Sequence, residues 1–165
     1  ELGLKSDNLE FKGILFIGLM IENDIPKVLE FHVRFGDPET QSVLPRLRTD
    51  IVEIMNACID GKLSSMDIKW DNKPSVTLIV ASKGYPETSS KGDVIRGLDN
   101  LGPEITLYHG GTKEEDGKIM TDGGRVLALT AVAGTMEEAR ETVYKETKKI
   151  QFDGMQYRKD IAKIN

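Results

Sequence analysis

The sequence is poor in the residues that form disulfides and zinc sites. It contains one cysteine and two histidines among 165 residues. A single cysteine cannot form an intrachain disulfide, and this composition is typical of a reducing compartment. A zinc site with nitrogen and sulfur ligands is nearly excluded for the same reason. Cys58 lies in an apolar stretch of helical period, so we interpret it as a core residue and not as a nucleophile.

The sequence also lacks long hydrophobic segments and any excess of positive charge. Its longest apolar run, Ile14–Ile21, has eight residues, far fewer than the roughly 20 needed to span a bilayer. The net charge is −5 and the pI is about 5.2, which gives no support for nucleic acid or a membrane as a partner. Neither a GxGxxG nor a GxxxxGK[ST] segment is present, so neither a dinucleotide-binding fold nor a Walker loop is indicated.

The length and composition indicate a folded protein of one large or two small domains. Hydrophobic residues make up 39% of the chain, an ordinary fraction for a globular protein. Residues 62–74 have no periodicity, so we expect a crossing between two domains, 1–65 and 66–165, with Trp70 packed at the junction. The chain begins at Glu1 without a signal-like segment. We therefore expect a cytoplasmic protein in which further residues precede Glu1.

The first part of the chain reads as a β-hairpin followed by helices. The apolar run 11–22 predicts a strand buried on both faces, and 26–35 predicts the next strand after a turn at 22–24. From Val43 to Ile59 the apolar period changes to about 3.6, which predicts helix. Asp50 and Glu53 have the spacing of a capping box, and Gly61 is a stop signal.

The second part reads as mainly β with one capped helix. The predicted strands are 75–82, 105–109, 118–121 and 125–132, separated by glycine-rich turns. Residues 135–149 predict a helix that begins with a capping box at Thr135 and Glu138. Its predicted inner stripe is Met136, Ala139, Val143, Thr147 and Ile150. The sequence therefore predicts an α+β protein.

Three titratable residues alternate along the second strand of the predicted hairpin. Val28, Glu30, His32 and Arg34 are expected on one face, with Leu29, Phe31, Val33 and Phe35 on the other. Glu30 and His32 could bind one divalent cation together, because a cation beside nucleotide phosphates needs only one or two protein ligands. Imidazole suits Mn²⁺ better than Mg²⁺. The alternative is a solvated strand face without a ligand.

Polar groups also gather in the loop after this strand and in two glycine-rich turns. Gly36 and Pro38 stiffen a loop that carries Asp37, Glu39 and Gln41, an arrangement common in binding sites. Arg34 could hold a planar anion through two donors, or form a salt bridge to Asp37 or Glu39. The turns Gly110-Gly111 and Gly123-Gly124-Arg125 could cradle a phosphate through backbone N–H groups, or could be simple tight turns. We interpret His109 as a hydrogen-bonded residue next to a turn.

The hexapeptide Arg34-Phe35-Gly36-Asp37-Pro38-Glu39 resembles the signature of the phosphoribosylamine–glycine ligase (GAR synthetase) family, whose members have the ATP-grasp fold. The segment 18–31 resembles the family's penultimate hairpin. Further similar blocks follow in the family's order: Ala81–Pro86, Lys91–Gly97, His109–Thr112, Gly123–Ala131 and Arg158–Ile161. The resemblance runs from about Phe11 to the end of the chain. It implies the C-terminal half of an ATP-grasp domain, an antiparallel hairpin plus helices, followed by a small β-rich domain.

The resemblance implies a role in purine biosynthesis. The family joins glycine to 5-phosphoribosylamine through a glycyl phosphate, with conversion of ATP to ADP and phosphate. By resemblance, Glu30 binds Mg²⁺ or Mn²⁺, with His32 at the position of the second metal ligand. Met20 and Leu29 line the adenine slot, and Arg34 steadies the acyl phosphate. Asp37, Glu39 and Gln41 line the acceptor pocket, and Gly123, Gly124 and Arg125 also contact substrate.

The sequence differs from the family pattern at one site residue and is shorter than the family's proteins. The family has asparagine at the position of His32. The chain corresponds to less than half of the family's length, so we expect that activity requires the missing N-terminal region. The alternative is a catalytically incompetent fragment that serves as a structural or interaction module, with exposed apolar surface around Ile14–Ile21.

Overall fold

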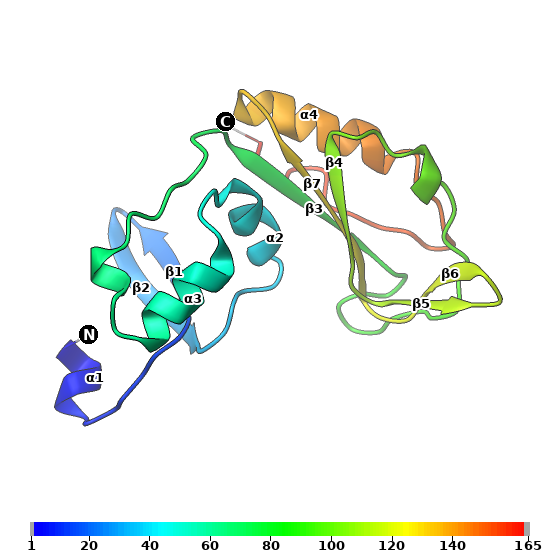
Figure 1. The fold of residues 1–165 in the computed structure, drawn as a ribbon. Coiled ribbons are helices and arrows are strands. Elements are labelled where there is room, and N and C mark those ends of the chain that lie inside the picture. Colours follow the sequence, from blue (N-terminus) through cyan, green and yellow to red (C-terminus); the bar gives the residue numbers. More distant parts are fainter. Residues whose placement is uncertain (1, 164–165) are drawn as a thin grey trace. The chain divides into compact units, whose positions relative to one another are not determined.

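The computed structural model describes residues 2–163 as two compact units (Figure 1). The first unit comprises the chain up to Thr40 together with Leu47–Asp71. The second comprises Gln41–Arg46 together with the chain from Asn72 onward. Both units contain antiparallel strands and few helices, which confirms the predicted α+β class. Among the described residues, no helix has the length and apolar character needed to cross a membrane.

The first unit contains the predicted hairpin. Strands β1 (Phe16–Glu22) and β2 (Ile25–His32) pair antiparallel. Asn23 and Asp24 form the two-residue loop, and both have left-handed backbone with φ of 51° and 60°, the geometry of a type I′ turn. Asn and Asp adopt this conformation more readily than other residues with side chains. A short helix, α1 (Leu2–Ser6), lies in the stretch for which the sequence made no prediction.

Helices follow the hairpin at the predicted places. Helix α2 (Thr40–Val43) leads into the 3₁₀ turn η1 (Leu44–Arg46), and α3 covers Ile51–Ile59. The Asp50 side chain accepts hydrogen bonds from the backbone N–H groups of Val52 (2.7 Å) and Glu53 (3.3 Å). Gly61 has φ of +70°, which suits a residue just after a helix end. A second 3₁₀ turn, η2, covers Leu63–Ser65.

The hairpin and α3 are far more exposed than predicted. The prediction that the first strand is buried on both faces is wrong: Leu19 is 48% exposed and Ile21 is 65% exposed. A continuous apolar run is typical of strands covered by layers on both sides, whereas the described hairpin is a two-stranded sheet. Cys58 is only partly buried, contrary to its core interpretation. Trp70 is 46% exposed and forms an isolated bridge with Leu47.

The second unit is a three-stranded antiparallel sheet with one helix packed across it (Figure 1). The strand order is β3 (Ser75–Ala81), β7 (Arg125–Val132), β4 (Ile105–His109). Helix α4 (Met136–Thr147) packs against β3 and β7. A separate hairpin consists of β5 (Thr112–Glu115) and β6 (Lys118–Thr121). Strand β5 was missed because its sequence, TKEE, lacks apolar alternation. The 3₁₀ turn η3 covers Leu98–Asn100.

The two faces of this sheet are buried in different ways. On one face Leu78 and Leu129, directly opposed in β3 and β7, pack in one cluster with Ala139 and Val143 of α4. On the other face Thr77 and Thr130 are opposed, and their hydroxyl groups lie 2.7 Å apart. The Ser42 hydroxyl donates to Thr77 (2.6 Å) and Thr130 donates to the carbonyl of Gln41 (3.0 Å). These bonds explain why Gln41–Arg46 belongs to the second unit.

Helix α4 has the predicted cap but an unexpected buried charge. Thr135 and Glu138 form the reciprocal capping box. Met136 is 37% exposed, so its assignment to the inner stripe is wrong. It is the first residue of the helix and precedes Ala139 and Val143, which pack in the core. Glu146 is fully buried, and one of its oxygens accepts from Lys149 Nζ (2.7 Å) and from Gly102 N–H (2.7 Å). These hydrogen bonds, that of Lys149 first, lower the pKa of Glu146.

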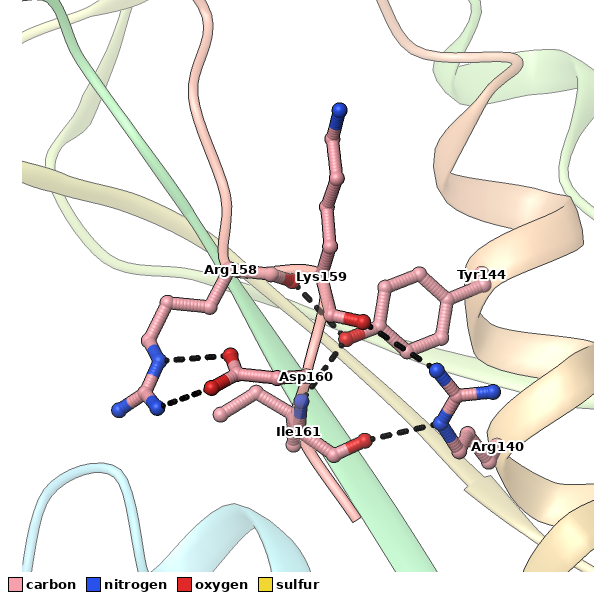
Figure 2. Close-up of polar contacts among 6 residues, drawn as sticks. All are labelled: Arg140, Tyr144, Arg158, Lys159, Asp160 and Ile161. Atoms are coloured by element: carbon pink, nitrogen blue, oxygen red, sulfur yellow. Dashed lines mark hydrogen bonds and ion pairs between the residues drawn. The ribbon is translucent and has the colours of Figure 1, made fainter. Parts of the chain in front are cut away.

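The segment 158–161 is held against α4 by two side chains (Figure 2). Arg140 donates to the carbonyls of Ile161 (3.1 Å) and Lys159 (3.2 Å). The Tyr144 hydroxyl donates to the Arg158 carbonyl (2.9 Å) and accepts from Ile161 N–H (3.1 Å). The Arg140 guanidinium also lies over the Tyr144 ring, 4.8 Å from its centre. Backbone groups of this segment are therefore satisfied by α4, which gives the segment a structural role.

Candidate functional site

An irregularity in the hairpin sets the position of Glu30. The pairing register shifts between Gly18 and Leu19, because β2 has one extra residue, Leu29, at that point. Gly18 is opposite Glu30, while Leu19 is opposite Val28. Since neighbours in β1 point to opposite faces, Glu30 and Val28 lie on opposite faces. The predicted row is therefore wrong at Val28 and correct for Glu30 and His32.

Glu30 and His32 come together on one face of the hairpin. His32 Nε2 lies 3.1 Å from Glu30 Oε2. The His32 ring stacks on Phe16, its partner across the strands, with ring centres 5.7 Å apart and planes at 28°. Glu30 lies over Gly18, where an added methyl group would stand 2.8 Å from Glu30 Cγ. The absence of a side chain at Gly18 thus leaves room for the carboxylate.

The donor atoms of this pair fit one divalent cation. A carboxylate oxygen and an imidazole nitrogen are both ordinary ligands for divalent transition metals. Both side chains reach solvent, with 57% of Glu30 and 31% of His32 exposed, so an ion bound to phosphate can approach them. Among residues 2–163, no group of three or more His, Cys, Asp or Glu side chains is placed to hold a metal ion. A divalent cation beside phosphates needs only one or two protein ligands.

The two residues predicted to contact adenine lie on the same hairpin. Met20 lies two residues along from Gly18, so it is on the face that carries Glu30. Leu29 occupies the irregular position itself. Met20 is 54% exposed and Leu29 is 64% exposed. Both apolar side chains are therefore accessible beside the carboxylate, as a contact with a nucleotide base requires.

Arg34 lies outside the strand. Because β2 ends at His32, the predicted alternation does not continue to Arg34. Its guanidinium donates from Nη1 to the carbonyl of Phe35, its own neighbour (2.9 Å), and its side chain is exposed. A guanidinium has five N–H donors, so an exposed one can engage a ligand in addition to this backbone contact.

The loop after Arg34 is tightly folded around Gly36. Gly36 is buried, and a methyl group there would collide with the Glu39 carboxylate and would stand 3.0 Å from Phe16 Cε2. Thr40 donates to the carbonyl of Gly36 through both its backbone N–H (3.1 Å) and its hydroxyl. Phe16 therefore lies beneath both His32 and the loop. Asp37 and Glu39 remain exposed at the surface of this loop.

The other predicted substrate residues lie in the second unit. Gln41 is anchored through its carbonyl to Thr130. Gly123 packs against Gly111, where a methyl group would stand 2.6 Å from Gly123 Cα. Gly124 lies against the Tyr85 ring, where an added methyl group would stand 2.5 Å from Tyr85 Cδ2. Arg125 is exposed and opposite Ala81.

Close backbone packing accounts for the glycines in these two turns. The buried Ser82 hydroxyl donates to the Gly123 carbonyl (2.9 Å), and Ser82 N–H donates to the Gly124 carbonyl (2.9 Å). Gly111 N–H donates to the Arg125 carbonyl (2.8 Å). His109 is the last residue of β4, next to the turn, and its Nδ1 lies 3.1 Å from the Thr112 hydroxyl, which confirms the prediction of a hydrogen-bonded residue near a turn. The tight-turn alternative therefore explains the glycines, while Arg125 stays accessible.

Sequence reasoning missed Phe16 as part of the site. The Phe16 ring stacks on the His32 ring and also packs against Gly36. Its position opposite His32 depends on the extra residue in β2. A regular hairpin with the same loop pairs Phe16 with Phe31, as follows from the pairing of Glu22 with Ile25. The signal available in the sequence was therefore misleading by one residue.

Comparison with protein families gives two matches along the chain. A model described as the phosphoribosylglycinamide synthetase C domain matches residues 75–164. A second, described as the ATP-grasp (A) domain of phosphoribosylglycinamide synthetase, matches residues 2–40. A curated phosphoribosylamine–glycine ligase of Caldanaerobacter subterraneus subsp. tengcongensis is 50% identical over 159 residues, which cover 96% of this chain and 38% of the relative. The chain thus spans about two fifths of that relative's length.

Solved structures show the same likeness. A phosphoribosylamine–glycine ligase from Thermotoga maritima matches with a TM-score of 0.83 and 33% identity, covering 97% of this chain and 39% of that one. The biotin carboxylase domain of the Hydrogenobacter thermophilus 2-oxoglutarate carboxylase matches with a TM-score of 0.60 at 15% identity, covering 86% of this chain and 32% of that one. The second match concerns the fold alone.

Proposed function

The chain belongs to the phosphoribosylglycinamide synthetase family, and on that basis we propose that it supplies the C-terminal portion of a phosphoribosylamine–glycine ligase. The reaction joins glycine to 5-phosphoribosylamine in purine biosynthesis, with conversion of ATP to ADP and phosphate, through a glycyl phosphate. Residues 1–65 complete an ATP-grasp domain and residues 66–165 form the C-terminal domain. The observation that carries this proposal is the convergence of Glu30 and His32 beside the exposed Met20.

Within this proposal the hairpin forms one wall of the nucleotide site. Glu30 and His32 hold a divalent cation, Mg²⁺ or Mn²⁺, and Met20 and Leu29 contact adenine. When bound, such a cation neutralises charge on phosphate oxygens and so stabilises phosphoryl transfer. The exposure of all four side chains supports this assignment, because the nucleotide needs direct access to them.

The loop after the hairpin takes the substrates. Arg34 holds the acyl phosphate by charge and hydrogen bonds, without covalent chemistry. Asp37, Glu39 and Gln41 bind the acceptor, and the exposed Arg125, which follows the tight turn of Gly123 and Gly124, contributes to substrate binding. The packing of Glu39 over the buried Gly36 supports this part, since it fixes the loop before substrate arrives.

A chimera tests the proposal. It joins this chain to the region of the Caldanaerobacter relative that lies outside the match, and the unmodified relative is the positive control. We expect ADP release that requires both glycine and 5-phosphoribosylamine. ADP release that is independent of glycine would contradict the proposal.

The chimera also separates the ligase from the alternative of an inactive interaction module. The observation that favours that alternative is the exposed apolar surface of the hairpin, where Ile21, Leu29 and Phe31 are each more than 60% exposed. An inactive, folded chimera combined with self-association of the isolated chain in sedimentation would favour the module.

A further inference from the structure

The spacing of the Glu30 and His32 donor atoms matches that of two neighbouring ligands on one ion. Two ligand atoms at right angles, each bonded at about 2.1 Å, stand about 3.0 Å apart. The observed separation between Nε2 and Oε2 is 3.1 Å. The distance between the two donor atoms is therefore already the one that a shared cation requires, and the ion would replace the direct contact between the two side chains.

The imidazole ring of His32 is held by packing. Stacking on Phe16 restrains the plane of the His32 ring. Phe16 is restrained in turn by the buried Gly36, which leaves only 3.0 Å between the Phe16 edge and an added methyl group. Restrained rings present a donor atom in one direction, which lowers the cost of ordering it on binding.

The two donors differ in the metals they favour. Carboxylate oxygen binds Mg²⁺ and Mn²⁺ alike, whereas imidazole nitrogen binds transition metals in preference to Mg²⁺. A site of one carboxylate and one imidazole therefore discriminates between ions in a way that a carboxylate and an amide oxygen do not. The discriminating atom in this chain is His32 Nε2.

We propose that His32 makes this site selective for Mn²⁺ over Mg²⁺. The inference rests on the proposed function, in which Glu30 and His32 hold the cation, and it adds the identity of the ion. The Glu30 carboxylate provides the affinity common to both ions, and His32 provides the difference in affinity between Mn²⁺ and Mg²⁺. Mn²⁺ binds the chain on the order of tenfold more tightly than Mg²⁺.

The test uses this chain, Mn²⁺ and Mg²⁺, at pH 8. Free Mn²⁺ is measured by electron paramagnetic resonance, and Mg²⁺ affinity is obtained by competition. In parallel, paramagnetic broadening of the histidine ring protons locates the ion. The chain has two histidines, so His109, which is bonded to Thr112 in the second unit, is the internal reference. The variants are His32→Asn, Glu30→Gln and, as a matched control on the same hairpin, Glu22→Gln.

We expect Mn²⁺ to broaden His32 and not His109. His32→Asn should bring the Mn²⁺ to Mg²⁺ preference down by about tenfold with little change in Mg²⁺ affinity, and Glu22→Gln should change neither. An unchanged preference in His32→Asn overturns the selectivity, while weaker binding in Glu30→Gln still supports the cation site. Binding that is unaffected by Glu30→Gln overturns the proposed cation site itself.

Discussion

Replacement of Lys149 by methionine should lower the free energy of unfolding of the second unit by about 4 kcal/mol, because it leaves an uncompensated carboxylate in the core. Glu146 is fully buried, and Lys149 supplies the opposite charge at 2.7 Å. Lys149 also donates to the Asn100 carbonyl (2.9 Å), so the substitution removes a second link between α4 and the loop before β4. The measurement is urea denaturation followed by far-UV circular dichroism.

A double variant separates buried charge from simple loss of packing. In Glu146→Gln/Lys149→Met the charge is gone and the amide oxygen can still accept from Gly102 N–H. This variant should be more stable than Lys149→Met alone. Lys148→Met, an exposed neighbour at the same helix end, should change stability by less than about 0.5 kcal/mol. A double variant less stable than Lys149→Met would show that the buried charge is not the cause.

The stabilisation has a defined pH dependence. Hydrogen bonds from Lys149 and then Gly102 lower the pKa of Glu146 in the folded protein, below its ordinary value of 4.5. Because the pKa of this carboxyl is lower in the folded than in the unfolded protein, it stabilises the fold at pH values above the ordinary pKa. That stabilisation is lost as the pH falls through the lowered pKa of the folded protein. The stability that this carboxylate contributes to the wild type should therefore be constant near neutral pH and fall as the pH drops below about 4.5, which urea denaturation of the wild type at a series of pH values measures.

Replacement of Glu30 by glutamine should reduce turnover of the chimera by about 100-fold at saturating ATP, or about 3 kcal/mol of transition-state stabilisation. The amide keeps the size of the side chain and can still contact His32, so the hairpin should keep its structure. It lacks the negative charge that holds the cation in the proposed site. The measurement is steady-state ADP release with both substrates present.

The control for Glu30 lies on the same hairpin. Glu22 is exposed and pairs with Lys27 at 2.8 Å, so Glu22→Gln removes one carboxylate without touching the site. Turnover of this variant should stay within twofold of the wild type, because exposed ion pairs contribute little. Equal turnover of the Glu30→Gln and wild-type chimeras would remove Glu30 from the site.

Features with local signals could be predicted from the sequence. Strands β3, β4, β6 and β7 of the second unit were predicted almost to the residue, because apolar residues and glycine-rich turns mark them directly, whereas β5 has no such signal. The helix caps at Asp50 and Thr135 could be predicted because each side chain accepts a hydrogen bond from a backbone N–H group only two or three residues further along the chain. The hairpin could be predicted because two apolar runs flank a turn signal at residues 22–24.

Features that depend on long-range pairing could not be predicted. The extra residue at Leu29 moves Glu30 to the face opposite Val28, and nothing local marks it. The burial of Glu146 depends on Gly102, 44 residues away. The exposure of the hairpin is contrary to its apolar sequence, since apolar patterning indicates which surface needs cover and not whether the described chain provides it.

The most direct test of the account is a structure of the chimera with ADP and the divalent cation. The account predicts the cation about 2.1 Å from a Glu30 carboxylate oxygen, with His32 Nε2 as its second protein ligand. A cation bound only by other residues, with Glu30 and His32 still in contact with each other at 3.1 Å, would contradict it.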